Sequence, residues 1–585
     1  MHHHKVLKRQ SMAFTATLAA FLVGACDQQV TAKRSFSGES QHQPTLAVSP
    51  IEMFKSCEEL TNHLLGTLAN IEQRRNIEDR TPWNASTRIG TPADSLPSSA
   101  ANSEIIGNRQ ERGVAEADFT AVGKHHIVIA RRNKLTILHR KSLTYAGKLY
   151  QASGQQITGI YIDGDRLAVI VNDFRTGSSI SIFSLAENAG PSLIVEKKFE
   201  HPVINSRVTG GHLVAIFQYQ LTGKEKPEGG KVAGVECTSV AKPQVDAEGL
   251  GLTRVLALNL HSPEKQESIV AALAASSRIY MNEENLYLSE NPWNDVTGIH
   301  KIRFDAQSGT LQFTASGKAP GFMQDDFAMR EVTLAGTRYL VLATNSKYKP
   351  DAKPTMGGWT DEPVSIQPMP MPSARANNLF IIKQEGATLL EAGKVTGIAP
   401  GENIMAVRYV DEMAYVVTFR QTDPLYAISL KDPAAPKILG ELKIPGFSEY
   451  LHPVADGRLL GVGVEATESG RRTGEVKVSL FDTSKPEDLK EKSVIKKQGQ
   501  SEANHDYKAF MYDPEMQTAF VPVSGGAMIL DVGTDVLAEK VFITQSGQIR
   551  RAFKFDGMLF TVSTEQIVAR DLNEPGKILL KSPAL

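Results

Sequence analysis

The feature that most constrains the fold is a recurring hairpin pattern: a short apolar strand, a tight polar turn and a second apolar strand. Nine copies start near residues 119, 160, 207, 279, 334, 408, 452, 511 and 553, as in "IYIDGDRLAVIV" and "FKFDGMLFTVS". Turns such as Asp163-Gly164, Gly210-Gly211 and Asp556-Gly557 supply the positive φ angles that two-residue hairpins require. From about residue 117 onward the chain is therefore predicted to be β-structure throughout.

A third strand, a turn with Pro or Asp and a fourth strand follow most of these hairpins, as in "LYAISLKDPAAPKILGELKI" from residue 425. Four strands at a period of roughly 40 to 50 residues are typical of propeller blades. We therefore predict an all-β fold, a single β-propeller over residues 117–585, with insertions near 222–250 and 345–378. It has eight four-stranded blades, or nine if every hairpin belongs to its own blade. Pairing of strands from the two chain ends would hide a blade boundary.

The stretch from residue 413 to 446 illustrates one predicted blade. Its segments "MAYVVTF" and "PLYAISL" are almost continuously apolar, as expected for strands covered on both faces by neighbouring blades. The next strand alternates, which predicts an outer strand with one solvated side. In it the polar residues Lys437, Glu441 and Lys443 fall opposite Ile438, Leu442 and Ile444.

The N-terminus carries a targeting pattern. A basic stretch, Lys5 to Arg9, precedes an apolar run from Met12 to Ala25, which is shorter than the roughly 20 residues of a membrane-spanning helix. The run ends in Val-Gly-Ala-Cys26, which resembles a bacterial lipobox, whereas the alternative is an ordinary secretory signal. We expect residues 1–25 to be a signal peptide and Cys26 to carry lipid. The protein is therefore expected to be exported and lipid-anchored on the periplasmic side. Asp27, which resembles the residue that retains lipoproteins in the inner membrane, favours retention there.

Three segments separate the signal from the propeller. Residues 26–48 are polar and predict a tether, and residues 77–116 are rich in Pro, Ser and Asn and predict a linker or wrapping segment. Between them, residues 49–76 predict an amphipathic helix that starts with a Ser49-Pro50-x-Glu52 capping box and docks on the propeller. Its apolar stripe consists of Phe54, Cys57, Leu60, Leu64, Leu68 and Ile71.

The remaining cysteines are few. With Cys26 acylated, Cys57 and Cys237 are the two left of the chain's 3 cysteines. In a compartment that permits disulfides they would staple the N-terminal helix to the main body, whereas the alternative is two buried free thiols.

Composition and motifs exclude several functions. Without residues 1–25 the chain holds 61 basic and 65 acidic residues, so no nucleic-acid partner is expected. The sequence lacks His-Glu-x-x-His, Cys-x-x-Cys, Gly-x-Ser-x-Gly and phosphate-loop motifs. No catalytic residue, metal site or cofactor is predicted, and enzymatic activity is left open but not favoured.

Two segments carry a family resemblance: "GNRQERGVAEADFTAVGKHHIVIA" from residue 107 and "VVTFRQTDPLYAISLKDPAAPKILGELKIPGFSEYLHP" from residue 416. They resemble the bacterial secreted and lipoprotein β-propeller domain family, which is distantly related to WD40 repeats and largely uncharacterised. The similarity covers residues 50 to 580, although Ala115 stands where the family pattern shows an acidic residue. The resemblance implies a propeller, and its motif positions are Gly113, Glu116, Asp118, Asp423, Pro424, Tyr450 and His452.

Glu116 and Asp118 lie two apart on an extended segment, so both carboxylates should share one face. They would meet a cation or cap backbone amides, and structural use is favoured. The functional hypothesis is a non-enzymatic scaffold with a protein or polymer partner at the envelope, bound through the insertions. The alternative is an enzyme or small-ligand binder that uses the central channel. First strands such as "IMAVRYV" and "ITGIYI" are apolar or small, which disfavours a catalytic channel.

Overall fold

The computed structural model describes residues 50–78 and 108–585, except 174, 188, 223–224, 226, 245–249, 291–294, 348–374, 420–422, 456 and 468–470. The predicted signal peptide, Cys26 and the tether therefore lie outside the described residues, as do most of the predicted linker and of the second insertion. No helix among the described residues is long and apolar enough to cross a membrane.

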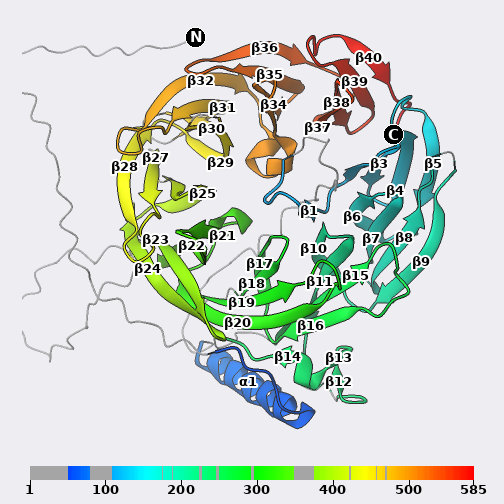
Figure 1. Cartoon of the computed structure of the whole chain (residues 1–585), viewed down its shortest axis with the longest axis vertical. Helices are drawn as coiled ribbons and strands as arrows, with labels where there is room; N and C mark the ends of the chain where they lie inside the picture. The colour runs from blue at the N-terminus through cyan, green and yellow to red at the C-terminus, as the bar shows by residue number, and fades with distance from the viewer. Residues whose placement is uncertain are drawn as a thin grey trace, which may run out of the picture. The chain divides into compact units, whose positions relative to one another are not determined.

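The described strands form nine blades of four antiparallel strands around a ring (Figure 1). The β-propeller prediction is confirmed, and the blade count is the higher of the two predicted. Blade 1 comprises β2 (Thr120–Val122), β3 (His126–Arg131), β4 (Lys134–His139) and β5 (Tyr145–Tyr150). Blade 2 comprises β6 (Gln155–Asp163), β7 (Arg166–Asp173), β8 (Gly177–Ser184) and β9 (Ser192–Phe199). Blade 3 comprises β10 (Val203–Thr209), β11 (His212–Gln220), β15 (Gly251–Asn259) and β16 (Ser268–Ala272).

Blade 4 comprises β17 (Ser276–Met281), β18 (Asn285–Glu290), β19 (Val296–Phe304) and β20 (Leu311–Pro320). Blade 5 comprises β21 (Met329–Leu334), β22 (Thr337–Lys347), β23 (Arg375–Glu385) and β24 (Thr388–Ile398). Blade 6 comprises β25 (Asn403–Val410), β26 (Met413–Phe419), β27 (Asp423–Ser429) and β28 (Lys437–Ile444). Blade 7 comprises β29 (Phe447–Val454), β30 (Arg458–Ala466), β31 (Arg472–Asp482) and β32 (Lys490–Gln498). Blade 8 comprises β33 (Met511–Asp513), β34 (Thr518–Val523), β35 (Gly526–Val532) and β36 (Leu537–Ile543). Blade 9 comprises β37 (Ile549–Phe555), β38 (Met558–Ser563), β39 (Ile567–Asp571) and β40 (Ile578–Lys581).

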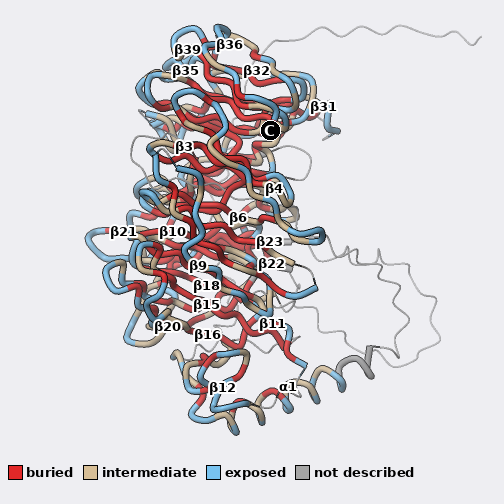
Figure 2. The backbone as a smooth tube through the Cα atoms, turned by 90° about the vertical axis from the view of Figure 1, so that its right-hand side faces the viewer, coloured by how far each residue is buried: buried red, intermediate tan, exposed pale blue. Residues whose placement is uncertain are grey.

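The second and third strands of each blade form the apolar layers between blades. In β26 five consecutive residues from Ala414 to Thr418 are buried, as the continuously apolar sequence predicts. Figure 2 shows buried backbone through the body of the ring and exposed backbone at its turns and margins. Outer strands such as β9 and β32 are mostly exposed or half-buried.

The predicted alternation of the outer strand β28 is only partly correct. It holds from Gly440 to Ile444, but Ile438 and Leu439 are both 41% exposed. The reason is a β-bulge: Ala427 pairs with Gly440 and Ile428 pairs with Ile438, which leaves Leu439 as the extra residue. The same irregularity between third and fourth strands occurs in eight of the nine described blades, the exception being blade 3.

The ring closes by side-chain packing between blades 9 and 1. All four strands of blade 9 come from residues 549–581, so the two chain ends do not share a blade. The stacked rings of Phe553, Phe555 and Phe560 join the core of blade 1, and Arg140 forms an ion pair with Asp556 at 2.9 Å.

Blades 4 and 5 are joined differently. Their outer strands β20 and β24 pair in parallel, with Ser316 opposite Thr388 and Gly317 opposite Leu389, so the two blades form one eight-stranded sheet. A Cβ on Gly317 would lie 2.5 Å from the carbonyl oxygen of Leu389. Only glycine permits this approach of the two backbones.

The first insertion extends blade 3 and receives the N-terminal helix. It contains β12 (Lys231–Val232), β13 (Val235–Glu236), the 3-10 helix η1 (Cys237–Ser239) and β14 (Val240–Ala241), which pairs in parallel with β16. The helix α1 (Cys57–Glu78) packs here, and Cys57 and Cys237 form a disulfide bond.

The predicted start of this helix at Ser49 is wrong. Met53 instead pairs with Ala241 across an isolated bridge, so residues 51–54 are extended along β14. The helix begins at Cys57, where the Ser56 hydroxyl accepts the Glu59 N–H at 3.1 Å. A second Ser-x-x-Glu pattern, Ser56 to Glu59, therefore caps the helix, because backbone pairing with the insertion holds the first pattern extended.

Candidate functional site

The centre of the ring is occupied by segments of the chain itself. Residues 108–118 enter it before blade 1, and β1 (Ala115–Glu116) adds to the inner edge of blade 3, with Glu116 opposite Arg207. The 3-10 helices η3 (Glu502–Asn504) and η4 (Tyr507–Ala509) enter between blades 7 and 8, and η2 (Asp326–Ala328) between blades 4 and 5. Figure 1 shows β1 and the orange helical turn inside the ring. We call these segments the plug.

Polar side chains join the plug segments to one another. Asn108 donates to the carbonyl of Tyr507 at 2.7 Å, and Gln110 donates to the carbonyl of Asp326 at 2.7 Å. Glu111 forms an ion pair with Arg330 of β21 at 2.8 Å. The described end of the segment that the sequence assigns to a linker, residues 108–116, is thus fixed at several points.

Glu116 occupies a buried position on β1. Its carboxylate accepts the Gln110 N–H at 3.0 Å and the hydroxyl proton of Tyr507. Burial acts to lower the pKa of the Arg207 guanidinium. The negative charge of the neighbouring Glu116 acts in the opposite direction, and the pKa lies above its usual value. The carboxylate therefore links the inner strand of blade 3 with η4.

Asp118 lies at the other end of the segment and meets blade 9. Its carboxylate accepts two hydrogen bonds from Arg551, from Nε at 2.9 Å and Nη2 at 3.1 Å. Arg551 also donates to Asp506 of the plug and, at 3.1 Å, to Glu502. Although burial opposes its charge, these carboxylates raise the pKa of Arg551. One guanidinium thus holds three carboxylates from two plug segments.

Tyr450 and His452 project from β29 of blade 7 and form a hydrogen-bonded chain with Asn108. The Asn108 amide donates to the Tyr450 hydroxyl at 2.7 Å, and that hydroxyl is hydrogen-bonded to His452 Nδ1 at 2.8 Å. Burial, with the nearby Arg408, lowers the pKa of His452 to about 3. The imidazole is therefore neutral.

The remaining motif positions lie elsewhere or play a backbone role. Gly113 has φ +84°, a conformation that favours glycine, and lies against the side chain of Glu283. Asp423 and Pro424 begin β27 in blade 6, opposite Ile444 and Lys443. The structure thus places Glu116, Asp118, Tyr450 and His452 together at the ring centre, whereas Asp423 and Pro424 belong to a blade.

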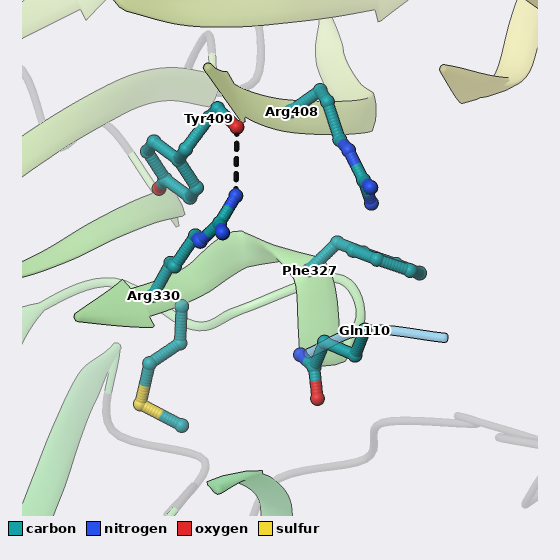
Figure 3. Close-up of a pocket in the computed structure, with 6 residues that line it drawn as sticks. Gln110, Phe327, Arg330, Arg408 and Tyr409 are labelled. Atoms are coloured by element: carbon teal, nitrogen blue, oxygen red, sulfur yellow. Dashed lines mark hydrogen bonds between the residues drawn. The ribbon is translucent and has the colours of Figure 1, made fainter. Parts of the chain in front are cut away.

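A cavity of about 10 Å³ remains beside the plug, lined by Gln110, Phe327, Met329, Arg330, Arg408 and Tyr409. Figure 3 shows Arg330 donating to the carbonyl of Tyr409, at 2.9 Å, with Arg408 above Phe327. Within the described part of the chain, Arg408 Nε and Gln110 Oε1 have no hydrogen-bond partner. The space and these two groups fit one water molecule.

A second polar cluster lies inside blade 4. His300 Nδ1 is 3.0 Å from the Ser316 hydroxyl, and its Nε2 contacts the Glu290 carboxylate. The residue types match an acyl-transfer triad. However, Ser316 and His300 are both 0% exposed and Glu290 is 3% exposed, so a substrate has no access to the hydroxyl. The cluster satisfies buried polar groups between strands.

Sequence reasoning missed the basic partners of the plug: Arg207, Arg408 and Arg551. Each lies on the first strand of a blade, where a buried charge is unusual. The segment "IMAVRYV", interpreted as apolar, contains Arg408. Arginine in a first strand was the available signal. Among the described residues, no three His, Cys, Asp or Glu side chains lie where they could hold a metal ion.

The fold and the ring centre define a β-propeller whose centre holds segments of its own chain. The chain belongs to the beta propeller domain family, whose model matches residues 107–574.

Two curated relatives are archaeal and uncharacterised. A Methanocaldococcus jannaschii protein is 32% identical over 295 residues, which cover 50% of this chain and 41% of the relative. An Archaeoglobus fulgidus protein is 36% identical over 203 residues, covering 34% of this chain and 31% of the relative. The chain thus spans less than half of either relative.

Among solved structures, the "putative 6-phosphogluconolactonase" of Bacteroides uniformis is similar. Its TM-score is 0.31 at 12% identity, and the match covers 56% of this chain and 90% of that one.

Proposed function

We propose that this protein is an exported, lipid-anchored and non-enzymatic β-propeller that binds a protein partner at the cell envelope. The observation that carries the proposal is the filled ring centre. Plug segments that pair with the strand of Arg207 and bond the Arg551 side chain occupy the place where channel enzymes would bind substrate. Binding then falls to the outer surface of the ring.

The bulged outer strands supply apolar groups on that surface. In blade 2 the bulge leaves Leu193 57% and Ile194 43% exposed, and blade 9 exposes Ile578 and Leu579 in the same way. The strand between them along the ring, β5 of blade 1, exposes Tyr150. These residues lie on neighbouring blades, and we call them the apolar rim. Aromatic and aliphatic groups beside a free strand edge favour a protein partner.

Two features support export and the membrane anchor. The Cys57–Cys237 disulfide is typical of an oxidising compartment. The lipobox resemblance at Cys26, which lies outside the described residues, supports the lipid anchor. Metabolic labelling with a palmitate analogue tests this part: label should enter the wild-type chain and be absent from the Cys26→Ser variant. Equal labelling of both chains would contradict the anchor.

The alternative, an enzyme or small-ligand binder in the channel, requires space. Ligand pockets usually measure about 300 to 1,000 Å³, whereas the described cavity at the plug is about 10 Å³. A channel function would require the plug to leave, which would expose several buried charges. We therefore favour the scaffold.

A photocrosslinking residue at position 193 in living cells, followed by mass spectrometry, tests partner binding. The matched control places the same residue at Ile438, which lies beside an equivalent bulge in blade 6. A single envelope protein captured from position 193 and not from position 438 is expected. The same background from both positions would contradict binding at the apolar rim. Capture of a polymer would contradict the proposal that the partner is a protein.

A further inference from the structure

A polar cleft of about 300 Å³ lies between blades 4 and 5 and shares no residue with the plug. Every side chain that lines it is charged or polar. Neighbouring blades otherwise meet through apolar clusters, such as the one that joins blades 9 and 1. The polar lining is therefore a departure from the way this ring is built.

The outer strands explain why space remains there. Parallel pairing of β20 with β24 fixes the outer edges at Gly317 and Leu389. The bulge of blade 4 then falls at Thr314, because Lys301 pairs with Ala315 and Ile302 with Phe313. Bulges redirect side chains, and the Thr314 side chain lines the cleft.

The cleft holds more positive than negative charge. Arg338 forms two hydrogen bonds with Glu284, at 2.5 and 3.1 Å, and Lys301 lies 3.6 Å from the buried Glu331. Arg303 also lines the cleft, is exposed, and makes no side-chain hydrogen bond or ion pair within the described residues. Among the lining residues, three cations therefore accompany one carboxylate, that of Glu284. Asp305, outside the lining, interacts with the charge of Arg303, but no hydrogen bond or ion pair holds that guanidinium among the described residues, so it is free to take a ligand.

The lining also limits the chemistry of that ligand. It contains no aromatic side chain, so it offers no stacking surface to a nucleobase or to the apolar face of a sugar ring. Guanidinium groups bind phosphate and carboxylate oxygens in a bidentate manner. The amides of Asn285 and Gln384 and the hydroxyl of Thr314 add donors and acceptors suited to hydroxyl groups.

We propose that this cleft is a binding site for a small hydrophilic oxyanion, a phosphate ester or carboxylate that also carries hydroxyl groups. Arg303 binds the oxyanion, and Lys301 and Arg338 supply further positive charge. Burial lowers the pKa of Lys301, and a bound anion would favour its charged form. The site is independent of the apolar rim and of the proposed partner.

Isothermal titration calorimetry of the purified full chain tests the site with glucose 6-phosphate, glucuronate and, as the uncharged comparison, glucose. We expect at least one anion to bind at least tenfold more tightly than glucose, with weaker binding at high salt. Arg303→Gln should weaken that binding about tenfold or more, because a charge-assisted pair is lost. The matched control is Arg175→Gln, an exposed turn position in blade 2, which should bind as the wild type does.

Because Arg303 is exposed and unpaired, its variant should keep the wild-type melting temperature, which separates lost binding from lost folding. Two outcomes would overturn the proposal. One is that neither anion binds more tightly than glucose. The other is that Arg303→Gln and Arg175→Gln bind the anion equally.

Discussion

The Arg551→Met variant tests the ion pairs that hold the plug. Arg551 is 2% exposed and is bonded to Asp118, Asp506 and Glu502. Methionine retains most of the volume and removes the charge, so the two buried aspartates lose their main counter-charge and keep only Lys508, which lies 3.6 Å from Asp506. Breaking a buried pair in this way costs about 3–5 kcal/mol. The unfolding entropy is roughly 2.1 cal/mol/K per residue, summed over the whole propeller. Dividing the loss of stability by this entropy gives an expected fall in Tm of about 3–5 °C.

The matched control is Arg550→Met on the same strand. Arg550 also pairs with Glu502, but its side chain is 29% exposed and Glu502 keeps Arg551 as a partner, so its loss should cost less than that of Arg551, about 1–2 kcal/mol. Urea unfolding at pH 7 and pH 4, followed by tryptophan fluorescence and circular dichroism, measures both variants. The Arg551→Met defect should shrink at pH 4, because protonation removes the unpaired charge of Asp118 and Asp506. Equal defects in the two variants at pH 7 would refute the reasoning.

Three further predictions concern other parts of the fold. The pKa of His452 falls to about 3 in the folded protein, so the imidazole stays neutral there but becomes charged in the unfolded chain below about pH 6.5. The free energy of unfolding should therefore fall with acid, by up to about 2 kcal/mol at pH 5. His452→Asn should flatten this pH dependence in urea titrations, and an unchanged slope would contradict the prediction. Replacing Cys57 and Cys237 together by serine should expose α1 to limited proteolysis and cost about 2–5 kcal/mol, and an unchanged cleavage rate would contradict the staple. Gly317→Ala should lower stability by about 1–3 kcal/mol in thermal melting, because its Cβ would meet the Leu389 backbone. The control Gly66→Ala, at a position of α1 with open space around it, should stabilise the protein by up to about 1 kcal/mol. Equal effects of the two variants would contradict the account of the junction between blades 4 and 5.

The blades could be predicted from the sequence because their determinants are local. Turn residues such as Gly210-Gly211, both with positive φ, fix hairpins, and continuously apolar strands such as Ala414 to Thr418 identify the covered layers. The pairing of Cys57 with Cys237 followed from counting cysteines in a chain that its N-terminal sequence predicts to be exported. These inferences require no knowledge of which blades touch.

The plug could not be predicted in the same way, because it depends on contacts between residues hundreds of positions apart. Glu116 meets Tyr507 and Asp118 meets Arg551, and neither pairing leaves a periodic pattern. The composition of residues 77–116 predicted a linker or wrapping segment, but not that its described end, residues 108–116, enters the ring. The buried arginines of the first strands were the visible signal, since a charge in an inner strand needs a partner.

The start of α1 and the exposure of Ile438 show a second limit. Both Ser49 and Ser56 head a Ser-x-x-Glu pattern, and only pairing of Met53 with Ala241 decides between them. The outer-strand bulge likewise arises from the shape of the blade, so strict alternation mispredicts Ile438.

Hydrogen–deuterium exchange of the full chain tests the central claim, the closed ring centre, most directly. The peptide that spans residues 108–118 should exchange slowly, on the timescale of β11, because Ala115 and Glu116 pair with β10 and are buried. Exchange of that peptide within seconds, while β11 stays protected, would show an open channel. That result would contradict the closed centre and favour a ligand-binding channel.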